Sequence, residues 1–221
     1  NLGLPCYRIA GRNYRSKVAA YATGFYRKQF AGNLTGQSKL LVDEATRYIS
    51  SGFQALKIKI GFGIEDDIAV VKAIRAAVGP DVKIMVDANH AYDRSTARQV
   101  ANRLSPYNID WFEEPLVPED QLGLAAFRRE SPIPVAAGEA EFCRWGFADL
   151  LRHGGVDIVQ PDCCAAGGFT ETLKIADLAD SMYVRCIPHV WGTGIAVMAA
   201  LQMLAMIAPC PLGLVPQEPL L

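Results

Sequence analysis

The chain has 221 residues, of which 51% are hydrophobic and 20% are charged, so it is long enough to form a sizeable core. Its 22 basic and 23 acidic residues leave a net charge of −1, which gives no electrostatic reason to expect binding to nucleic acid or to an anionic membrane. No apolar run reaches the roughly 18 residues of a membrane span, and the six cysteines show no CxxC pair. We therefore expect a cytoplasmic protein with reduced cysteines.

Short apolar runs alternate with segments of helical periodicity along the whole chain. The predicted strands lie at residues 17–24, 55–61, 83–89, 110–114, 135–139, 157–162, 185–189 and 214–218. The predicted helices lie at residues 39–51, 64–78, 94–104, 119–129, 142–153, 168–179 and 192–208. This alternation is typical of a parallel α/β sheet, and eight units close most simply into a TIM-type (β/α) barrel. A doubly wound open sheet is the alternative, but it would not gather the ends of six strands around one point.

Three acidic residues stand 26 residues apart, each at the end of a predicted strand. They are Asp87, Glu113 and Glu139, in the runs IMVDAN, WFEEP and VAAGE. That interval is the length of one strand–helix unit, so the three carboxylates are expected at the carboxyl ends of neighbouring strands. There they would repel one another unless a cation holds them, and oxygen donors suit Mg²⁺, with Mn²⁺ as a substitute. Strand alternation sends only one of Glu113 and Glu114 towards the barrel axis, and the spacing favours Glu113.

Two lysines extend the same phase towards the N-terminus. Lys59 lies 28 residues before Asp87, and Lys57 leaves the same strand on the same side two residues earlier. At a separation of roughly 7 Å, like charges repel by about 2.4 kcal/mol at an effective dielectric near 20. Because this repulsion favours release of a proton, we expect Lys59 to act as a general base.

The phase also continues towards the C-terminus. Asp162 lies 23 residues after Glu139, and His189 lies 27 residues after Asp162. A carboxylate bonded to one imidazole nitrogen fixes the tautomer and raises the basicity of the ring, so we expect Asp162 to orient His189 for acid–base chemistry. Asn89 and His90 follow a predicted strand at the mouth of the site and are candidates for substrate contacts. A role in the loop is the alternative for His90.

This set of residues closely resembles the enolase superfamily and, within it, the mandelate racemase branch. The matching pieces, spread over about residues 16–218, are Lys57-x-Lys59, Asp87-x-Asn89, Glu113-Glu114-Pro115, Gly138-Glu139, and the partners Asp162 and His189. In the branch typified by muconate lactonizing enzyme, a lysine stands three residues after the sixth-strand aspartate. Ala165 stands at that position here, which argues against that branch.

The resemblance implies a site and a reaction. It implies that Asp87, Glu113 and Glu139 bind Mg²⁺, that Mg²⁺ holds a substrate carboxylate, and that Lys59 and His189 lie on opposite faces of its α-carbon. It also implies that Glu218 donates a proton to the enolate oxygen. The reaction that we rank first is dehydration of an acid sugar to a 2-keto-3-deoxy product. The alternative is a racemase or epimerase of a 2-hydroxy acid.

The resemblance also bears on domain organisation. Residues 17–218 are expected to form a single barrel domain, and about residues 1–16 resemble the junction that follows an α+β capping domain in this family. Because that capping domain is absent from the chain, a non-catalytic fragment is a further alternative. The expected partners are a small-molecule carboxylate and further copies of the chain in a homo-oligomer.

Overall fold

A computed structural model describes residues 2–27 and 34–209 of the chain. The chain divides into two compact units. The N-side unit comprises residues 20–135, and the C-side unit comprises residues 1–19 together with residues 136–221. Helices and strands alternate along both units, as the sequence pattern predicts.

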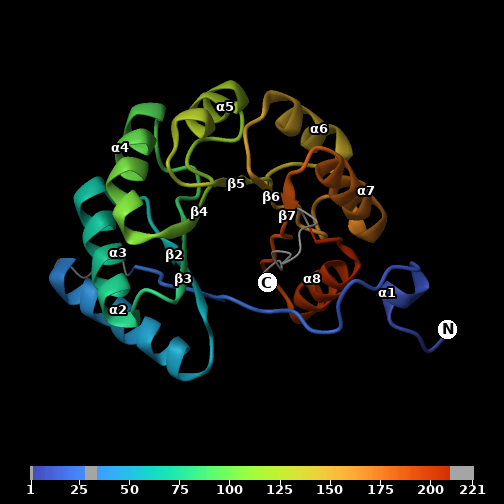
Figure 1. The fold of residues 1–221 in the computed structure, drawn as a ribbon, viewed down its shortest axis with the longest axis horizontal. Coiled ribbons are helices and arrows are strands. Elements are labelled where there is room, and N and C mark those ends of the chain that lie inside the picture. The colour runs from blue at the N-terminus through green and yellow to red at the C-terminus, as the bar shows by residue number, and fades with distance from the viewer. Residues whose placement is uncertain (1, 28–33, 210–221) are drawn as a thin grey trace. The chain divides into compact units, whose positions relative to one another are not determined.

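The N-side unit consists of four strands with their helices along one side of them (Figure 1). In chain order its elements are β1 (Ala22–Thr23), α2 (Leu34–Ser50), β2 (Ala55–Lys59), α3 (Ile64–Val78), β3 (Lys83–Asp87), α4 (Arg94–Leu104), the 3-10 helix η1 (Ser105–Tyr107), β4 (Ile109–Glu113) and α5 (Gln121–Glu130). The four strands pair in chain order, and every pair is parallel. Their carboxyl ends therefore lie at one edge of the sheet.

Apolar side chains fill the space between these strands and helices. Leu56 and Ile58 of β2, Ile84 and Val86 of β3, and Phe112 of β4 are all fully buried. Burying one such side chain stabilises a fold by about 1.5–3 kcal/mol. Side chains on the opposite face of these strands, such as Met85 and Trp111, are buried as well, which explains why the strand sequences read as continuous apolar runs rather than as strict alternation.

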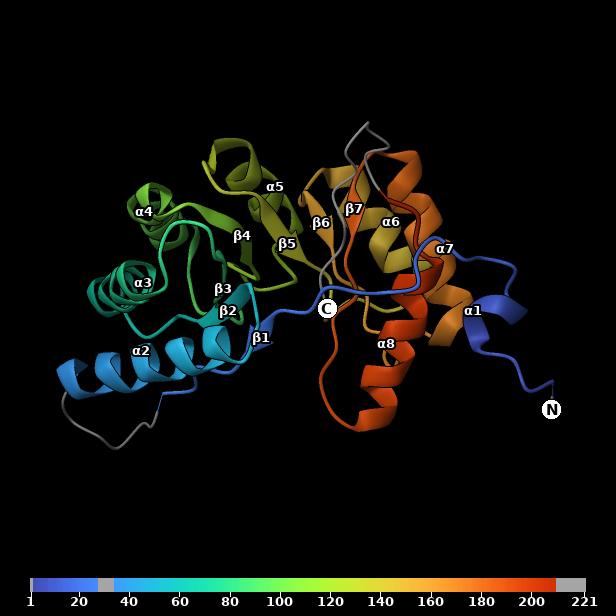
Figure 2. The same cartoon turned by 60° about the horizontal axis from the view of Figure 1, so that its bottom comes forward.

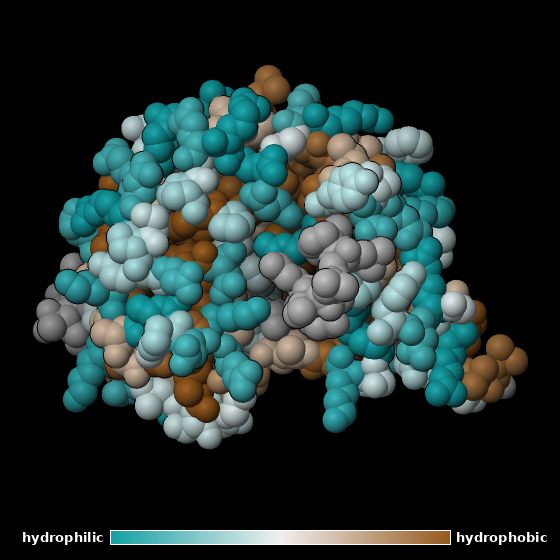
Figure 3. All heavy atoms as spheres, in the orientation of Figure 1, coloured by the Kyte–Doolittle hydropathy of each residue, from teal (hydrophilic) through white to brown (hydrophobic). Residues whose placement is uncertain are grey.

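The helices of this unit begin and end where local chemistry requires. The first turn of α3 carries Glu65, Asp66 and Asp67, whose negative charge suits the positive end of the helix dipole. The N-cap of α4 is Asp93, whose side chain accepts a hydrogen bond from the backbone N–H of Thr96 at 2.7 Å. The outer face of α4 is mainly hydrophilic (Figure 3), as expected for an amphipathic helix packed on a sheet.

The C-side unit repeats the same pattern. Its elements are α1 (Cys6–Ile9), β5 (Val135–Ala137, of which the first residue belongs to the N-side unit), α6 (Cys143–His153), β6 (Ile158–Val159), α7 (Gly168–Ser181), β7 (Arg185–Cys186) and α8 (Gly194–Met206). The strands β5, β6 and β7 pair in this order and in parallel. Figure 2 shows α1 beside α7 and α8, where the guanidinium of Arg12 donates two bonds of 2.7 Å to Asp177 of α7.

Several elements differ in extent from the sequence prediction. Helices 64–78 and 94–104 have the predicted bounds, but the strands predicted at residues 17–24 and 157–162 form only two-residue ladders. In the second of these, Pro161 has no backbone N–H to donate. Helix α1 was not predicted, because its four residues carry no periodic pattern. The predicted strand 214–218, with Glu218, lies outside the described residues.

The five cysteines within the described residues are all free, in agreement with the prediction of reduced thiols. In the same part of the chain, no helix has the length and apolar character that crossing a membrane requires.

Candidate active site

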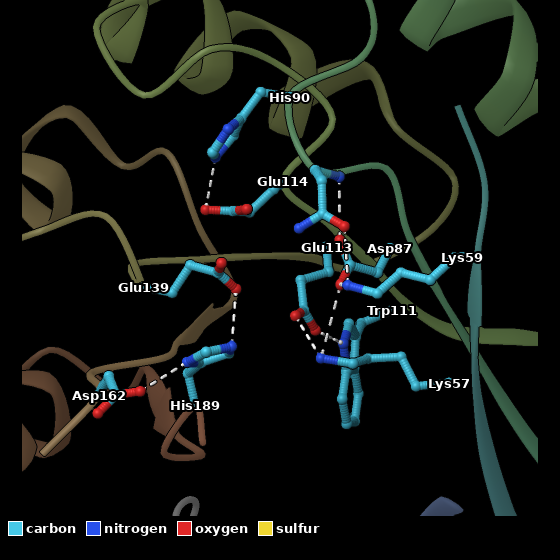
Figure 4. A network of polar contacts seen from close by, with 11 residues as sticks. Lys57, Lys59, Asp87, His90, Trp111, Glu113, Glu114, Glu139, Asp162 and His189 are labelled. Carbon is cyan, nitrogen blue, oxygen red and sulfur yellow. Dashed lines mark hydrogen bonds and ion pairs between the residues drawn. The ribbon is translucent and has the colours of Figure 1, made fainter. Parts of the chain in front are cut away.

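In the N-side unit, the register of the strands places three predicted site residues side by side. Lys59 is aligned with Asp87 across β2 and β3, and Asp87 is aligned with Glu113 across β3 and β4. All three are the last residues of their strands (Figure 4). Asp87 and Glu113 are each 0% exposed. Two carboxylates are thus buried next to each other and need positive charge nearby.

The two predicted lysines supply that charge. Lys57 Nζ lies 2.5 Å from Oε1 of Glu113 and 3.7 Å from Oδ2 of Asp87. Lys59 Nζ lies 2.5 Å from Oδ2 of Asp87 and donates to Oδ1 of Asn89 at 2.7 Å. Both ammonium groups therefore point into the same cluster, as expected for residues two positions apart on one strand.

The charges of this cluster shift the pKa values of its members. Burial and the neighbouring Glu113 raise the pKa of Asp87, whereas Lys57 and Lys59 oppose that rise. Burial alone would lower the pKa of Lys57, but Glu113, Tyr21 and Asp87 outweigh it, and the pKa is raised well above its ordinary value. Lys57 is therefore a fixed positive charge that compensates Glu113 rather than a group that exchanges protons near neutral pH.

Two residues that the sequence reasoning did not assign also contact this cluster. The indole Nε1 of Trp111 donates to Oε2 of Glu113 at 3.0 Å, and the ring of Tyr21 lies 5.4 Å from Lys57 Nζ in a cation–π contact. Trp111 was detectable in principle, because it stands two residues before Glu113 and so leaves β4 on the same side. No local pattern indicated Tyr21.

The loops after β3 and β4 adopt backbone conformations that the prediction did not include. Asn89, His90 and Glu114 have φ angles of 42°, 66° and 44°, in the left-handed region that non-glycine residues rarely enter. Glu114 is consequently as buried as Glu113, so strand alternation does not separate the two. Its Oε1 lies 2.7 Å from Nε2 of His90 (Figure 4), which joins the two loops.

In the C-side unit, the predicted residues form a second cluster around His189. Its Nδ1 lies 2.9 Å from Oδ2 of Asp162, and its Nε2 lies 3.1 Å from Oε2 of Glu139. Both ring nitrogens thus face carboxylate oxygens. The backbones of Asp162 and His189 also form a parallel bridge beyond β6 and β7. The other carboxylate oxygen of Asp162 accepts from the backbone N–H of Cys164 at 2.7 Å.

A glycine places Glu139 at the end of β5. Gly138 has a φ of 136°, and a Cβ at this position would lie 2.7 Å from Cε1 of Phe147 and 3.1 Å from the backbone nitrogen of Gln160. Such contacts are too close for any side chain. The Gly138-Glu139 pair that the sequence singled out therefore has a steric reason.

The donor set of the predicted magnesium site can be tested for its chemistry. Asp87, Glu113 and Glu139 offer only carboxylate oxygens, the ligands that Mg²⁺ prefers. Burial first, and then the nearby charge of Glu113, raise the pKa of Asp87, and a divalent cation would offset the cost of keeping this carboxylate charged. The chemistry of these donors suits Mg²⁺. Within the described ranges, no three His, Cys, Asp or Glu side chains are grouped as a ready cation site.

Comparison with known proteins places the chain in a family. Residues 40–217 match the family described as Enolase C-terminal domain-like. D-galactarolactone cycloisomerase from Agrobacterium fabrum is 44% identical over 213 residues, which are 96% of this chain and 55% of that protein. Arabinonate dehydratase from Saccharolobus solfataricus is 39% identical over 203 residues, which are 91% of this chain and 52% of that protein.

Solved structures agree with this assignment. A racemase from Streptomyces coelicolor, described with bound magnesium, is 29% identical, with a TM-score of 0.80 over 91% of this chain and 53% of that one. The chain thus spans about half the length of the relatives it matches, and the relatives named here are enzymes. Together with the alternation of parallel strands and helices, these matches show that the chain has a TIM-barrel-type α/β fold and belongs to the enolase superfamily, among the proteins of the mandelate racemase and muconate lactonizing enzyme type.

Proposed function

We propose that the protein removes the α-proton of a sugar-acid carboxylate with the help of Mg²⁺ and then eliminates the β-hydroxyl, which makes it an acid-sugar dehydratase. One observation carries the proposal. Two groups of the type that exchanges protons, Lys59 at the end of β2 and His189 just beyond β7, are each held by a buried carboxylate. A purely structural role would not require both of these pairs, Lys59 with Asp87 and His189 with Asp162.

Lys59 is the proposed base. Its Nζ would take the α-proton of the substrate, and its contacts with Asp87 and Asn89 orient it for this step. Lys57 stays charged beside Glu113 and contributes fixed positive potential near the place where negative charge develops.

His189 is the proposed acid. Asp162 holds Nδ1, so Nε2, which faces Glu139, is the atom that would deliver a proton to the departing β-hydroxyl. Asp87, Glu113 and Glu139 would hold Mg²⁺. When bound, the ion would neutralise the negative charge that develops on the substrate carboxylate. Asn89 and His90, at the rim of the N-side cluster, are proposed substrate contacts, and Glu218 is proposed as the proton donor to the enolate oxygen.

The names of the relatives support an acid sugar as the substrate class. One is an arabinonate dehydratase and another a D-galactarolactone cycloisomerase, and both names denote sugar-derived acids or their lactones. The proposed product of dehydration is a 2-keto-3-deoxy acid. We propose that the enzyme works in the cytoplasm as a homo-oligomer.

A second candidate has a specific observation in its favour. The relative at 44% identity is a cycloisomerase, and an isomerase leaves the composition of its substrate unchanged. The same residues could serve it, because the α-proton is removed in both reactions and only the group that leaves from the β-carbon differs. Racemisation is the third outcome, in which His189 returns a proton to the opposite face of the α-carbon.

One experiment separates the three reactions. The full-length protein is incubated with Mg²⁺ in D₂O with a panel of sugar acids and sugar lactones, and products are followed by NMR and mass spectrometry. Loss of one water with a 2-keto product identifies a dehydratase. A lactone converted to a product of the same composition identifies a cycloisomerase, and deuterium incorporation with inversion identifies a racemase. If no substrate reacts or exchanges its α-proton, the proposed function is wrong.

A further inference from the structure

A buried carboxylate away from the proposed proton-transfer groups connects the loop that follows Lys59 with the turn that follows Asp87. Asp67 lies in the first turn of α3, and its residue is 0% exposed. Its two oxygens accept hydrogen bonds from three separate segments of the N-side unit: the loop after β2, the turn after β3, and Arg27. No step of the proposed reaction assigns a role to Asp67.

The first segment is the loop that follows Lys59. The oxygen Oδ2 of Asp67 accepts from the backbone N–H groups of Gly61, Phe62 and Gly63 at 3.1, 3.1 and 3.2 Å. Three consecutive N–H groups directed at one carboxylate fix the course of a loop strongly, because charge-assisted hydrogen bonds are stronger than neutral ones. This loop begins two residues after Lys59, the last residue of β2.

The second segment is the turn that follows Asp87. The hydroxyl of Tyr92 donates to Oδ2 of Asp67 at 2.6 Å, and the Tyr92 ring packs edge-on against Phe112 with centroids 6.1 Å apart. Tyr92 stands three residues after Asn89, the residue that accepts a bond from Lys59. The hydroxyl of Tyr92 therefore links the Asn89 turn to the same carboxylate that holds the Lys59 loop.

The two loops also lie against each other directly. A Cβ added to Gly61 would lie 2.6 Å from the Cβ of Ala91 and 3.1 Å from the carbonyl oxygen of Ala88. Close packing of this kind transmits small displacements instead of absorbing them. A shift of the Tyr92 turn would thus reach the Lys59 loop through this contact as well as through Asp67.

The charge of Asp67 is balanced within the same cluster. Nη2 of Arg27 lies 2.9 Å from Oδ1 of Asp67, and the guanidinium is stacked 4.3 Å from the centre of the Phe62 ring. Burial, reinforced by Asp67, raises the pKa of Tyr92, so its hydroxyl remains a donor. The cluster is therefore built to keep one carboxylate satisfied by donors from both loops.

We infer that Asp67 is a positioning residue for Lys59. Through the 61–63 loop and through Tyr92, its carboxylate sets the 2.7 Å contact between Lys59 Nζ and Asn89 and the direction of the ammonium group. This inference rests on the proposed function, which assigns Lys59 as the base. A base displaced by about 1 Å can lose on the order of 100-fold in rate, so the bond between Tyr92 and Asp67 acts on turnover more than on substrate binding.

The test compares Tyr92→Phe with Glu65→Gln in the full-length protein. Tyr92→Phe removes only the hydroxyl and keeps the ring that packs on Phe112. Glu65→Gln changes an exposed carboxylate in the same helical turn, whose partner is Arg103. With the sugar acid found to react, we expect kcat to fall by about 10-fold or more in Tyr92→Phe while KM changes by less than about twofold. Glu65→Gln should match wild type in both constants. Asp67→Asn should lower kcat at least as much as Tyr92→Phe.

Amide hydrogen exchange gives a readout that does not depend on activity. In Tyr92→Phe the amides of residues 61–63 and 89–91 should exchange faster than in wild type, whereas those of α5 should not change. Unchanged exchange in both segments, or a kcat of Tyr92→Phe equal to that of Glu65→Gln, overturns the inference. If wild type itself does not act on any sugar acid, the proposed function fails, and the exchange experiment still decides whether Asp67 couples the two loops. Should Asp67→Asn fail to fold, Tyr92→Phe carries the test alone.

Discussion

Nζ of Lys57 in β2 lies 2.5 Å from Oε1 of Glu113, the last residue of β4, and both side chains are buried. Neither charge has bulk water around it, so each depends on the other. The same ammonium lies 3.7 Å from Asp87. Because of this arrangement, we expect the stability of the N-side unit to fall when any one charge of the cluster is lost.

Replacing Lys57 by Met should destabilise the protein by about 3–5 kcal/mol, because Glu113 would stay buried without its cation. The measurement is the free energy of unfolding from urea denaturation. Lys174→Met is the matched control, since Lys174 is exposed and its contact with Glu171 is long, at 3.4 Å, and it should change stability by less than about 0.5 kcal/mol. Equal effects of the two substitutions would show that the charge of Lys57 is not needed for folding.

Replacing Lys59 by Met, or His189 by Asn, should lower kcat for the reacting sugar acid by about 100-fold to 10,000-fold. This is the range expected for loss of a general acid or base. Both variants should retain the far-ultraviolet circular dichroism of wild type. Lys83→Met is the control, because Lys83 is exposed at the opposite end of β3 from Asp87. In a dehydratase, Lys59→Met should also stop deuterium exchange at the α-carbon. Exchange at the wild-type rate would exclude Lys59 as the base.

Replacing Glu139 by Gln should weaken Mg²⁺ binding by about 10-fold to 100-fold, because one of three proposed carboxylate ligands loses its charge. Titration with MgCl₂ followed by calorimetry measures the affinity without substrate. Glu130→Gln is the control, since Glu130 forms an exposed ion pair with Arg98 on the helical side of the sheet. An unchanged affinity in Glu139→Gln would remove Glu139 from the ligand set.

The contact between Arg144 and Glu171 predicts a dependence of stability on pH. Hydrogen bonds from the Arg144 side chain and backbone lower the pKa of Glu171 from its ordinary value of 4.5 to about 2. A carboxyl whose pKa is lower in the folded state stabilises the fold above its unfolded pKa, and this contribution is lost as the pH falls through the folded pKa. Stability should therefore decline between about pH 4.5 and about pH 2.

Thermal unfolding of wild type and Glu171→Gln across that range checks this prediction. The variant should lose less stability than wild type on acidification, because the group that takes up the proton is absent. At pH 7 the variant should be the less stable of the two, since Arg144 has lost its charged partner. Parallel curves for the two proteins would show that Glu171 does not titrate with a lowered pKa.

Local periodicity was enough to predict the order of strands and helices and the carboxyl-end positions of the site residues. The bounds of α3 and α4 agreed with the prediction, because their apolar positions recur at helical spacing and their ends carry strong local signals, Gly63 and Gly79 for α3 and Asp93 for α4. The extents of β1 and β6 did not agree, because the length of a ladder depends on the neighbouring strand.

The sequence alone determined which residues stand at the strand ends, since the interval between Asp87, Glu113 and Glu139 repeats the length of one strand–helix unit. Only the tertiary structure decided which side chain each carboxylate meets: Lys57 at Glu113, Lys59 at Asp87, and His189 at Glu139. It likewise decided that Asp67 connects two loops. These contacts join residues distant in the chain, and some depend on left-handed backbone angles at the loops. Neither property has a signature in local sequence.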